Sequence, residues 1–338
     1  MPSFKNKFAK YKVMLNKVNS ILRIIAKKLM FATQLFSNEF NWYKRCLNYN
    51  NSDHSKGADL SSLLVISHVL EKGITMPNRR LGFGYERVRL VIERCNFCIS
   101  QYGSEPMEIQ SALVDLRDYF AIHEEASFKL PEDIVNGING LVNHIISDKA
   151  SSWMEFTPDT FFKKCNSFEE FTGSRHTCRY YSKEPVEIDK IVDCIRIAQT
   201  APSACNRQST RVHIISSREA KQVVLKYQNG TRGFGQDADK FLLITAEQSA
   251  WDFRQSKSAF IDAGLYTMAL LYALHEKKIC ACTLNAHIFG NSLDSFYREI
   301  GIPKSEILIA FIAIGNAVDK FLVAKSERIQ TESLYSII

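Results

Sequence analysis

The segment 259–275 constrains the fold of this chain most, because it is apolar on almost every side. Its sequence, AFIDAGLYTMALLYALH, is long enough for several helical turns and carries only isolated polar residues. A helix without a solvent-facing side is buried, either in the core of a domain or between two subunits. The sequence therefore predicts a central helix here and leaves both locations open.

Helices and strands are expected to alternate around this helix, so region 173–330 is predicted to be an α+β domain. Amphipathic spacing predicts the helices, and short apolar runs bounded by turn residues predict the strands. The predicted helices are 188–199, 218–227, 259–275 and 292–300, and the predicted strands are 212–216, 240–245, 279–284 and 307–314.

The first 150 residues are predicted to form an all-α N-terminal domain. From 35 to 146 the pattern is helical, with breaks at short turns that contain glycine, proline or asparagine. Residues 151–172 carry aromatic side chains and mixed charge without a clear period, so we interpret them as a connector that packs against something. Residues 331–338 would form a C-terminal tail.

Residues 4–30 are predicted to form a basic amphipathic helix. Its apolar stripe recurs at spacings of three and four, and lysines and arginines surround it with no acidic residue before Glu39. Such helices lie at anionic membrane surfaces, so residues 1–30 could make a peripheral membrane contact. The alternative we favour is packing on the chain's own domain or on a partner subunit. No apolar run of about eighteen residues exists, so no membrane span is expected.

Charge and cysteine usage narrow the class of protein. The net charge of +7 is concentrated near the N-terminus, so general nucleic-acid binding is not expected. Nine scattered cysteines and no secretory signal peptide predict a cytoplasmic protein. The pairs Cys95/Cys98 and Cys280/Cys282 fall in a predicted helix and strand, so we expect buried, inert thiols and no metal site.

The loop 201–208, APSACNRQ, carries groups suited to a flat polar ligand. Pro202 ends the preceding helix, and the loop presents the side-chain amides of Asn206 and Gln208 before a strand. An amide both donates and accepts hydrogen bonds, as a polar heterocycle requires. The alternative is a turn in which Asn206 satisfies its own backbone.

The segment 174–180, SRHTCRY, carries groups suited to an anion. Arg175, Arg179 and His176 lie within a few positions of the Thr177 hydroxyl, as binding of a phosphate dianion requires. By itself, a short basic segment is more often a solvated surface.

These segments, in this order, resemble the FMN-dependent nitroreductase family. Pro-Ser-x-x-Asn-x-Gln before a strand resembles the family's flavin-contacting loop, and 174–180 resembles its Arg-Arg/His-Ser-x-Arg/Lys-x-Phe phosphate segment. Residues 325–328, KSER, resemble its C-terminal phosphate clamp, with Ala324 where a proline is usual. The family's Pro-Trp after the Gln is Ser209-Thr210 here.

The resemblance covers about residues 170–330 and implies a nitroreductase-like mixed sheet flanked by helices, with the central helix in the interface of a homodimer. It implies bound FMN, NAD(P)H as electron donor and a small-molecule electron acceptor. FMN would carry the hydride chemistry, so we nominate no catalytic side chain. The implied cofactor-binding residues are Arg175, His176, Thr177, Arg179, Pro202, Ser203, Asn206, Gln208, Thr283, Leu284, Asn285, Lys325, Ser326 and Arg328.

The block 67–84 is similar to a helical region that precedes the nitroreductase domain in family members associated with polysaccharide gene clusters. This similarity suggests a link to polysaccharide biosynthesis. His68, Glu71 and Lys72 share one helical turn there, and could form a small polar site or a solvated, mutually hydrogen-bonded face.

A second hypothesis assigns no flavin chemistry to the chain. In that case the nitroreductase-like half would be a dimerisation platform, and the basic first helix would attach it to a membrane or to a glycan-synthesis complex. The missing Pro-Trp and the changed surroundings of residues 325–328 motivate this alternative.

Overall fold

The computed structural model describes residues 18–26, 29–30, 33, 56–146, 151–251, 255–288 and 290–338. The chain divides into two compact units, Met1–Ala58 and Asp59–Ile338. Of the predicted first helix, residues 18–26 are helical, and their apolar side chains Val18, Leu22 and Ile25 are exposed. Residues 4–17 and 27–28 of that prediction lie outside the described residues. No helix among the described residues is long and apolar enough to cross a membrane.

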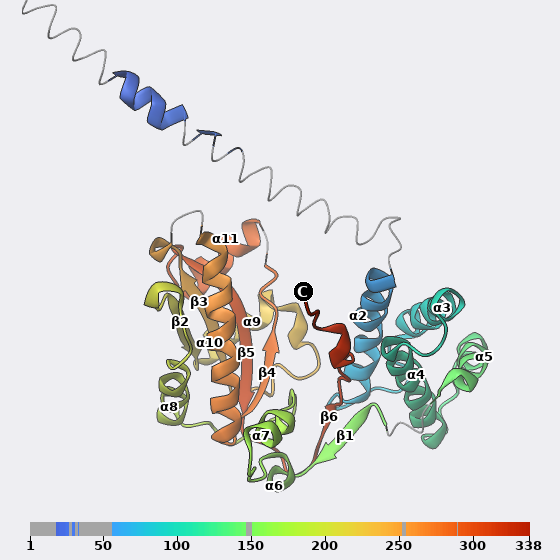
Figure 1. Cartoon of the computed structure of the whole chain (residues 1–338). Helices are drawn as coiled ribbons and strands as arrows, with labels where there is room; N and C mark the ends of the chain where they lie inside the picture. Colours follow the sequence, from blue (N-terminus) through green and yellow to red (C-terminus); the bar gives the residue numbers. More distant parts are fainter. Residues whose placement is uncertain are drawn as a thin grey trace, which may run out of the picture. The chain divides into compact units, whose positions relative to one another are not determined.

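Four helices with a shared apolar core follow, as the helical pattern predicted. They are α2 (Lys56–Ile74), α3 (Tyr85–Tyr102), α4 (Met107–Glu125) and α5 (Glu132–Leu141), followed by the short η2 (Val142–His144). Each helix contributes buried apolar side chains to one cluster, for example Leu63 of α2, Val91 of α3, Leu113 of α4 and Ile134 of α5. Figure 1 shows α2 to α5 grouped together.

The connector predicted for 151–172 contains secondary structure that its sequence pattern did not reveal. A strand, β1 (Trp153–Phe156), precedes two short helices, α6 (Pro158–Phe161) and α7 (Phe168–Ser174). β1 pairs antiparallel with β6 (Phe321–Ala324), another strand that the sequence did not predict. Each strand has only four residues and depends on a partner far away in the sequence, so local periodicity could not identify either one.

A four-stranded sheet forms the centre of the second half, in the order β2-β3-β5-β4. The helices and strands agree in type and order with the predicted ones, and the α+β class is confirmed. Their bounds are α8 (Ile188–Ala198), η3 (Ala204–Asn206), β2 (Thr210–Ile215), α9 (Arg218–Tyr227), η4 (Asn229–Thr231), β3 (Lys240–Glu247), η5 (Gln248–Ala250), α10 (Ser256–Glu276), β4 (Cys280–Leu284), α11 (Asn291–Ile300), β5 (Glu306–Gly315) and η7 (Thr331–Ser333).

The sheet differs from the expectation in one detail, because its described strand pairs are all antiparallel rather than a mixture. The connection from β2 to β3 shows the reason. After β2, helix α9 and the glycine-rich loop 228–239 return the chain to the end of β2, because Ile215 there pairs with Phe241 at the start of β3. β3 therefore starts where β2 ends and runs in the opposite direction.

Both faces of the sheet are covered by helices. Alternate residues of β3 point to opposite faces, so Leu242 and Ile244 pack with α8 and α10, whereas Phe241 and Leu243 pack with α9 and α11. Figure 1 shows α10 running along the length of the sheet. Two buried faces explain why β3 and β5 have nearly continuous apolar sequences instead of alternating ones.

The predicted buried thiols are confirmed. Cys95, Cys98, Cys280 and Cys282 are at most 1% exposed. Burial in apolar surroundings disfavours the thiolate and raises the pKa of Cys98 and Cys282. These thiols therefore act as small apolar side chains in their cores.

Candidate functional site

A cavity of about 460 Å³ brings together two segments that lie far apart in the sequence. One is the turn that follows α7, and the other is the chain that leaves β6. We call this cavity the cation pocket. Of the site residues predicted from the sequence, it is lined by Arg175, His176, Thr177, Arg179, Lys325, Ser326 and Arg328.

Backbone pairing positions the first of these segments. The N–H of Cys178 donates to the carbonyl of Ala281 in β4, at 3.0 Å, so the segment continues the edge of the sheet. The Cys178 side chain is fully buried, and the hydroxyl of Tyr181 donates to the carbonyls of Cys178 and Ala313. Arg179 and Thr177 flank Cys178 in this extended backbone and line the pocket.

The second segment is held by the helical region. The N–H of Lys325 donates to the carbonyl of Ser152, at 2.9 Å, which extends the pairing of β6 with β1. Ser326 has φ of +49°, in the left-handed region, and turns the chain away from the strand. The carboxylate of Glu71 in α2 accepts hydrogen bonds from the N–H of Ser326, at 2.5 Å, and from its hydroxyl, at 3.2 Å.

The cation pocket holds more positive charge than nearby groups neutralise. The Nε atoms of Arg175 and Arg179 are buried and have no hydrogen-bond partner within the described part of the chain. Burial lowers the pKa of Arg175, and nearby Arg328 lowers it further. Buried donors without acceptors are costly, so two such guanidinium groups indicate a site that an anion would complete.

The two histidines beside the arginines, His176 and His275, both have lowered pKa values. Burial, Arg175 and Arg328 lower the pKa of His176. Burial, together with Arg175 and His176, lowers the pKa of His275 to about 4. His275 is hydrogen-bonded to Ser174 at 2.9 Å and packs against Phe161 and Phe162. At neutral pH it is an uncharged, packed side chain behind the pocket.

In the C-terminal segment 325–328, Lys325 is paired with a carboxylate, whereas Arg328 is exposed. The Nζ of Lys325 lies 2.6 Å from a carboxylate oxygen of Glu327, so its charge is largely neutralised. Arg328 is exposed, and its Nη1 donates to the carbonyl of Ser326 at 2.8 Å. The Ser326 hydroxyl is engaged by Glu71. Of the three residues predicted here, Arg328 is exposed at the cation pocket, whereas Ser326 fixes the turn.

The loop 201–208 lies at a different cavity of the same chain. Pro202, Ser203 and Gln208 line a hollow of about 350 Å³ with Asp262 and Tyr266 of α10. In the single chain, the arginine segment and this loop are therefore not brought into one cavity.

The backbone of this loop is unusual and is held in place. Cys205, Asn206 and Gln208 all have positive φ, near +50°, which is uncommon for residues other than glycine. The N–H of Ala204 donates to the carboxylate of Asp262 at 2.9 Å, which fastens the loop to α10. The exposed Asn206 and Gln208 amides are hydrogen-bonded to each other at 3.0 Å. The hydrogen bond of the Asn206 side chain is to the Gln208 side chain rather than to its own backbone, and both residues are exposed.

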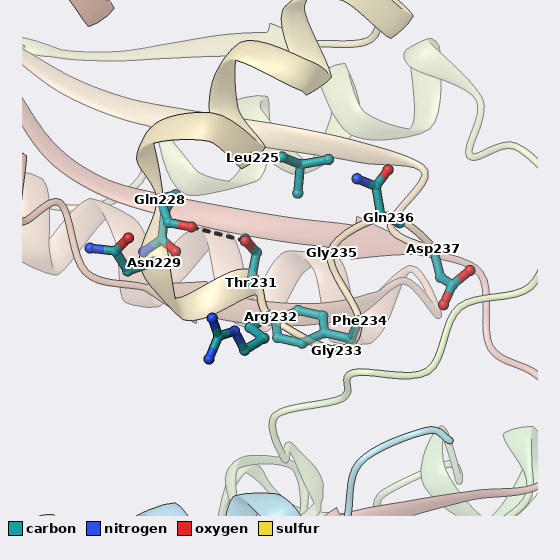
Figure 2. Close-up of a pocket in the computed structure, with 10 residues that line it drawn as sticks. All are labelled: Leu225, Gln228, Asn229, Thr231, Arg232, Gly233, Phe234, Gly235, Gln236 and Asp237. Carbon is teal, nitrogen blue, oxygen red and sulfur yellow. Dashed lines mark hydrogen bonds between the residues drawn. The ribbon is translucent and has the colours of Figure 1, made fainter. Parts of the chain in front are cut away.

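The predicted contacts at the end of β4 lie outside both cavities. Leu284 is buried, whereas Thr283 and Asn285 are exposed. The Asn285 carbonyl accepts a hydrogen bond from the side chain of Gln228, at 2.8 Å, which links β4 to the glycine-rich loop. This loop lines a third cavity, of about 790 Å³, at residues 225–237. Figure 2 shows that the lining comes from the end of α9, the turn at Thr231 and the loop itself.

Sequence reasoning missed two contributions to the cation pocket. Met268 and Tyr272 of α10 form an apolar part of its wall, and His68 of α2 forms another part. The polar residues around His68 marked this turn of α2 in the sequence. The residues that line the cation pocket with His68 lie more than a hundred positions later in the chain. The predicted mutual hydrogen bonding is present, since His68 contacts Glu71 at 3.1 Å, and both side chains also take part in longer-range structure.

Comparison with solved structures gives weak similarities that cover half of this chain. A nitroreductase family protein from Clostridium difficile 630 is 20% identical over 50% of this chain and 97% of its own, with a TM-score of 0.42. An FMN-dependent nitroreductase from Clostridium difficile R20291 is 18% identical over 49% of this chain and 92% of its own, with a TM-score of 0.39.

A nitroreductase family protein from Streptococcus pneumoniae TIGR4 is 16% identical over 51% of this chain and 100% of its own, with a TM-score of 0.42. No curated protein sequence matches this chain. Residues 173–231 match the model of the Nitroreductase family, and this span contains both the arginine segment of the cation pocket and the loop that carries Asn206.

Proposed function

We propose that the chain is an FMN-dependent oxidoreductase of the nitroreductase type, reduced by NAD(P)H and acting on a small-molecule acceptor. The observation that carries the proposal is the pair of buried arginine Nε atoms without acceptors in the cation pocket. A phosphate dianion would supply those acceptors. The family match over residues 173–231 supports FMN as the molecule that carries the phosphate.

The residues present fit a phosphate group. Arg175, Arg179 and Arg328 would donate charge-assisted hydrogen bonds to its oxygens, with His176 and the Thr177 hydroxyl as further donors on the same wall. Lys325 and Ser326 would shape the pocket floor, because each already has a partner within the chain. Arginine suits this role, since its planar group keeps its charge when partly buried.

A second copy of the chain would complete the site. The loop with Asn206 and Gln208 would meet the flavin ring of the other subunit, because within one chain it lies at a separate cavity. The surface of α10 supports this arrangement. Phe260, Ile261 and Leu265 are about half exposed, and Asp262 beside them fastens the loop. An apolar face of this kind is suited to subunit pairing, and the loop would enter the interface with it.

When bound, FMN would supply the hydride and electron transfer that no side chain can perform. The chain would hold its phosphate with the arginines, orient its ring with the amides of the partner subunit's loop, and exclude water with the apolar wall of α10. Thr283, Leu284 and Asn285 at the end of β4 are the backbone positions expected beside the reacting edge of the ring. No general acid or base is assigned.

The proposals for the electron acceptor and for the cellular location rest on two sequence features, the block 67–84 and residues 1–30. The similarity of the block 67–84 suggests an acceptor linked to polysaccharide biosynthesis. A cytoplasmic enzyme that touches an anionic membrane through residues 1–30 would fit such a role. Sedimentation of the full chain with anionic and neutral liposomes tests the contact. Equal sedimentation with both, or no loss on deleting residues 1–30, would rule it out.

The test of the function is spectroscopic. The purified full chain is expected to show visible flavin bands, or to gain them with FMN, and to bleach when NADH or NADPH is added under anaerobic conditions. Reoxidation by candidate acceptors, including quinones and nitro compounds, then identifies the substrate class. A colourless protein that has no affinity for FMN would reject the proposal and favour the flavin-free dimerisation platform.

A further inference from the structure

We propose that His68 of α2 is an anion-binding residue of the cation pocket, so that the N-terminal helical region forms part of the phosphate site. The proposal rests on the proposed function only in naming the FMN phosphate as the anion. The pocket and its unpaired arginine atoms are features of this chain.

The position of His68 is the first argument. It lines the same cavity as Arg175, Arg179 and Arg328, although it belongs to the helical region rather than to the sheet. Its side chain is 51% exposed, so it is accessible to a ligand and is not needed for the core. No described residue is hydrogen-bonded to its Nε2, whereas its Nδ1 is bonded to Glu71.

The second argument is that the imidazole is held in place. Glu71 is only 7% exposed, and its carboxylate contacts both His68 and the turn at Ser326. One helical turn after His68, the Nζ of Lys72 donates to the carbonyl of Gly230 at 2.9 Å. These contacts fix α2 against the C-terminal segment and the glycine-rich loop, so His68 stays at the pocket without a ligand.

The third argument is charge. The two Glu71 carboxylate oxygens are directed at the Ser326 N–H and hydroxyl and at the Nδ1 of His68. In an imidazolium both ring nitrogens donate, so Nδ1–H remains on Glu71 and Nε2–H is available to a phosphate oxygen. His68 thus adds a donor from a part of the chain outside the span 173–231 that matches the family.

The experiment compares the full-length wild type with His68→Gln, His68→Arg and the control His144→Gln, an exposed histidine of η2 away from the pocket. Thermal unfolding of the flavin-free chain is followed with and without inorganic phosphate. FMN and riboflavin affinities are measured by fluorescence quenching. Riboflavin has the same ring and no phosphate, so it reports contacts other than those to the anion.

His68→Gln is expected to reduce the phosphate-induced rise in melting temperature by about half and to weaken FMN binding about five- to tenfold, with riboflavin unchanged. His68→Arg should restore both, and His144→Gln should match the wild type. Equal phosphate responses in wild type and His68→Gln would overturn the inference, as would an equal loss for FMN and riboflavin. If the wild type responds to phosphate but binds no flavin, the proposed function fails and the phosphate arm alone decides the role of His68.

Discussion

The carboxylate of Glu71 in α2 accepts a hydrogen bond from the main-chain N–H of Ser326, 255 positions later in the chain, at 2.5 Å. The same carboxylate accepts from the Ser326 hydroxyl and contacts His68. Because Glu71 is buried, these bonds are poorly screened by water. The turn that places Arg328 at the cation pocket therefore depends on a residue of the helical region.

Replacing Glu71 with Ala should destabilise the chain by about 2 kcal/mol, because it leaves the Ser326 N–H without its acceptor. Part of the loss is offset by relief of the buried Asp115, whose pKa is raised by burial and by the charge of Glu71. Urea unfolding measures the change. Glu86→Ala, at an exposed carboxylate that pairs with Arg89, should change stability by less than about 0.5 kcal/mol. Equal effects of the two substitutions would contradict the role of Glu71.

Replacing Arg175 with Met should leave the flavin-free chain at least as stable as the wild type, while weakening FMN binding about tenfold or more. The reason is that the guanidinium is partly buried beside Arg328, with no acceptor for its Nε. Melting curves with and without FMN separate the two effects. Arg196→Met, at an exposed residue paired with Asp193, serves as the control and should alter neither. A loss of stability in Arg175→Met without ligand would show that the arginine is structural.

His275 should make the chain less stable as pH falls from about 6.5 to about 4. Its folded-state pKa is lowered to about 4 from the ordinary 6.5 by burial, Arg175 and His176. Above pH 6.5 the ring is neutral in both states, and between the two values only the unfolded chain takes up the proton, which favours unfolding. Below about pH 4 both states are protonated and the dependence ends.

Between pH 6.5 and pH 5, the contribution of His275 to this loss of stability should be on the order of 2 kcal/mol. His275→Asn should therefore show a shallower loss of stability than the wild type when chemical unfolding is measured at pH 7, 6 and 5. The exposed His144→Asn is the matched control and should keep the wild-type slope. Parallel slopes for wild type and His275→Asn would refute the assignment.

Replacing Ile261 with Glu should convert the proposed dimer to monomers, because it puts a charge into the exposed apolar face of α10. Ile261 is 61% exposed in the single chain, and Val65 of α2 is 62% exposed, which makes Val65→Glu a closely matched control. Sedimentation velocity measures the outcome, and Ile261→Glu should also lose FMN because the partner's loop is lost. A dimer that survives in Ile261→Glu would place the interface elsewhere.

The helices and strands of region 173–330 could be predicted because their signals are local. Helical spacing identified α8 and α9, and the apolar runs of β3 and β5 identified strands. β1 and β6 escaped prediction because each is four residues long and exists only through pairing with the other. The antiparallel order of the sheet also depends on how long connections fold back.

The candidate site, like the fold, was predicted from the sequence only in part. Residue type indicated an anion-binding segment at 175–179, the family resemblance implied another at 325–328, and both line one cavity. The sequence did not reveal that Lys325 and Ser326 are already engaged by Glu327 and Glu71, or that His68 lines the same pocket. Those facts concern neighbours, and short motifs specify residues without specifying their partners.

By itself, the sequence determined that α10 must be covered along most of its surface, since its apolar residues leave no polar side. Only the tertiary structure decided how: Ala263, Leu270 and Leu274 are buried against the sheet, while Phe260, Ile261 and Leu265 remain exposed. Likewise, the sequence contains the basic residues of the cation pocket, and only the fold determines which of them lack a counter-charge. The physical reason is that periodicity and composition are properties of a segment, whereas burial and charge pairing depend on contacts between distant segments.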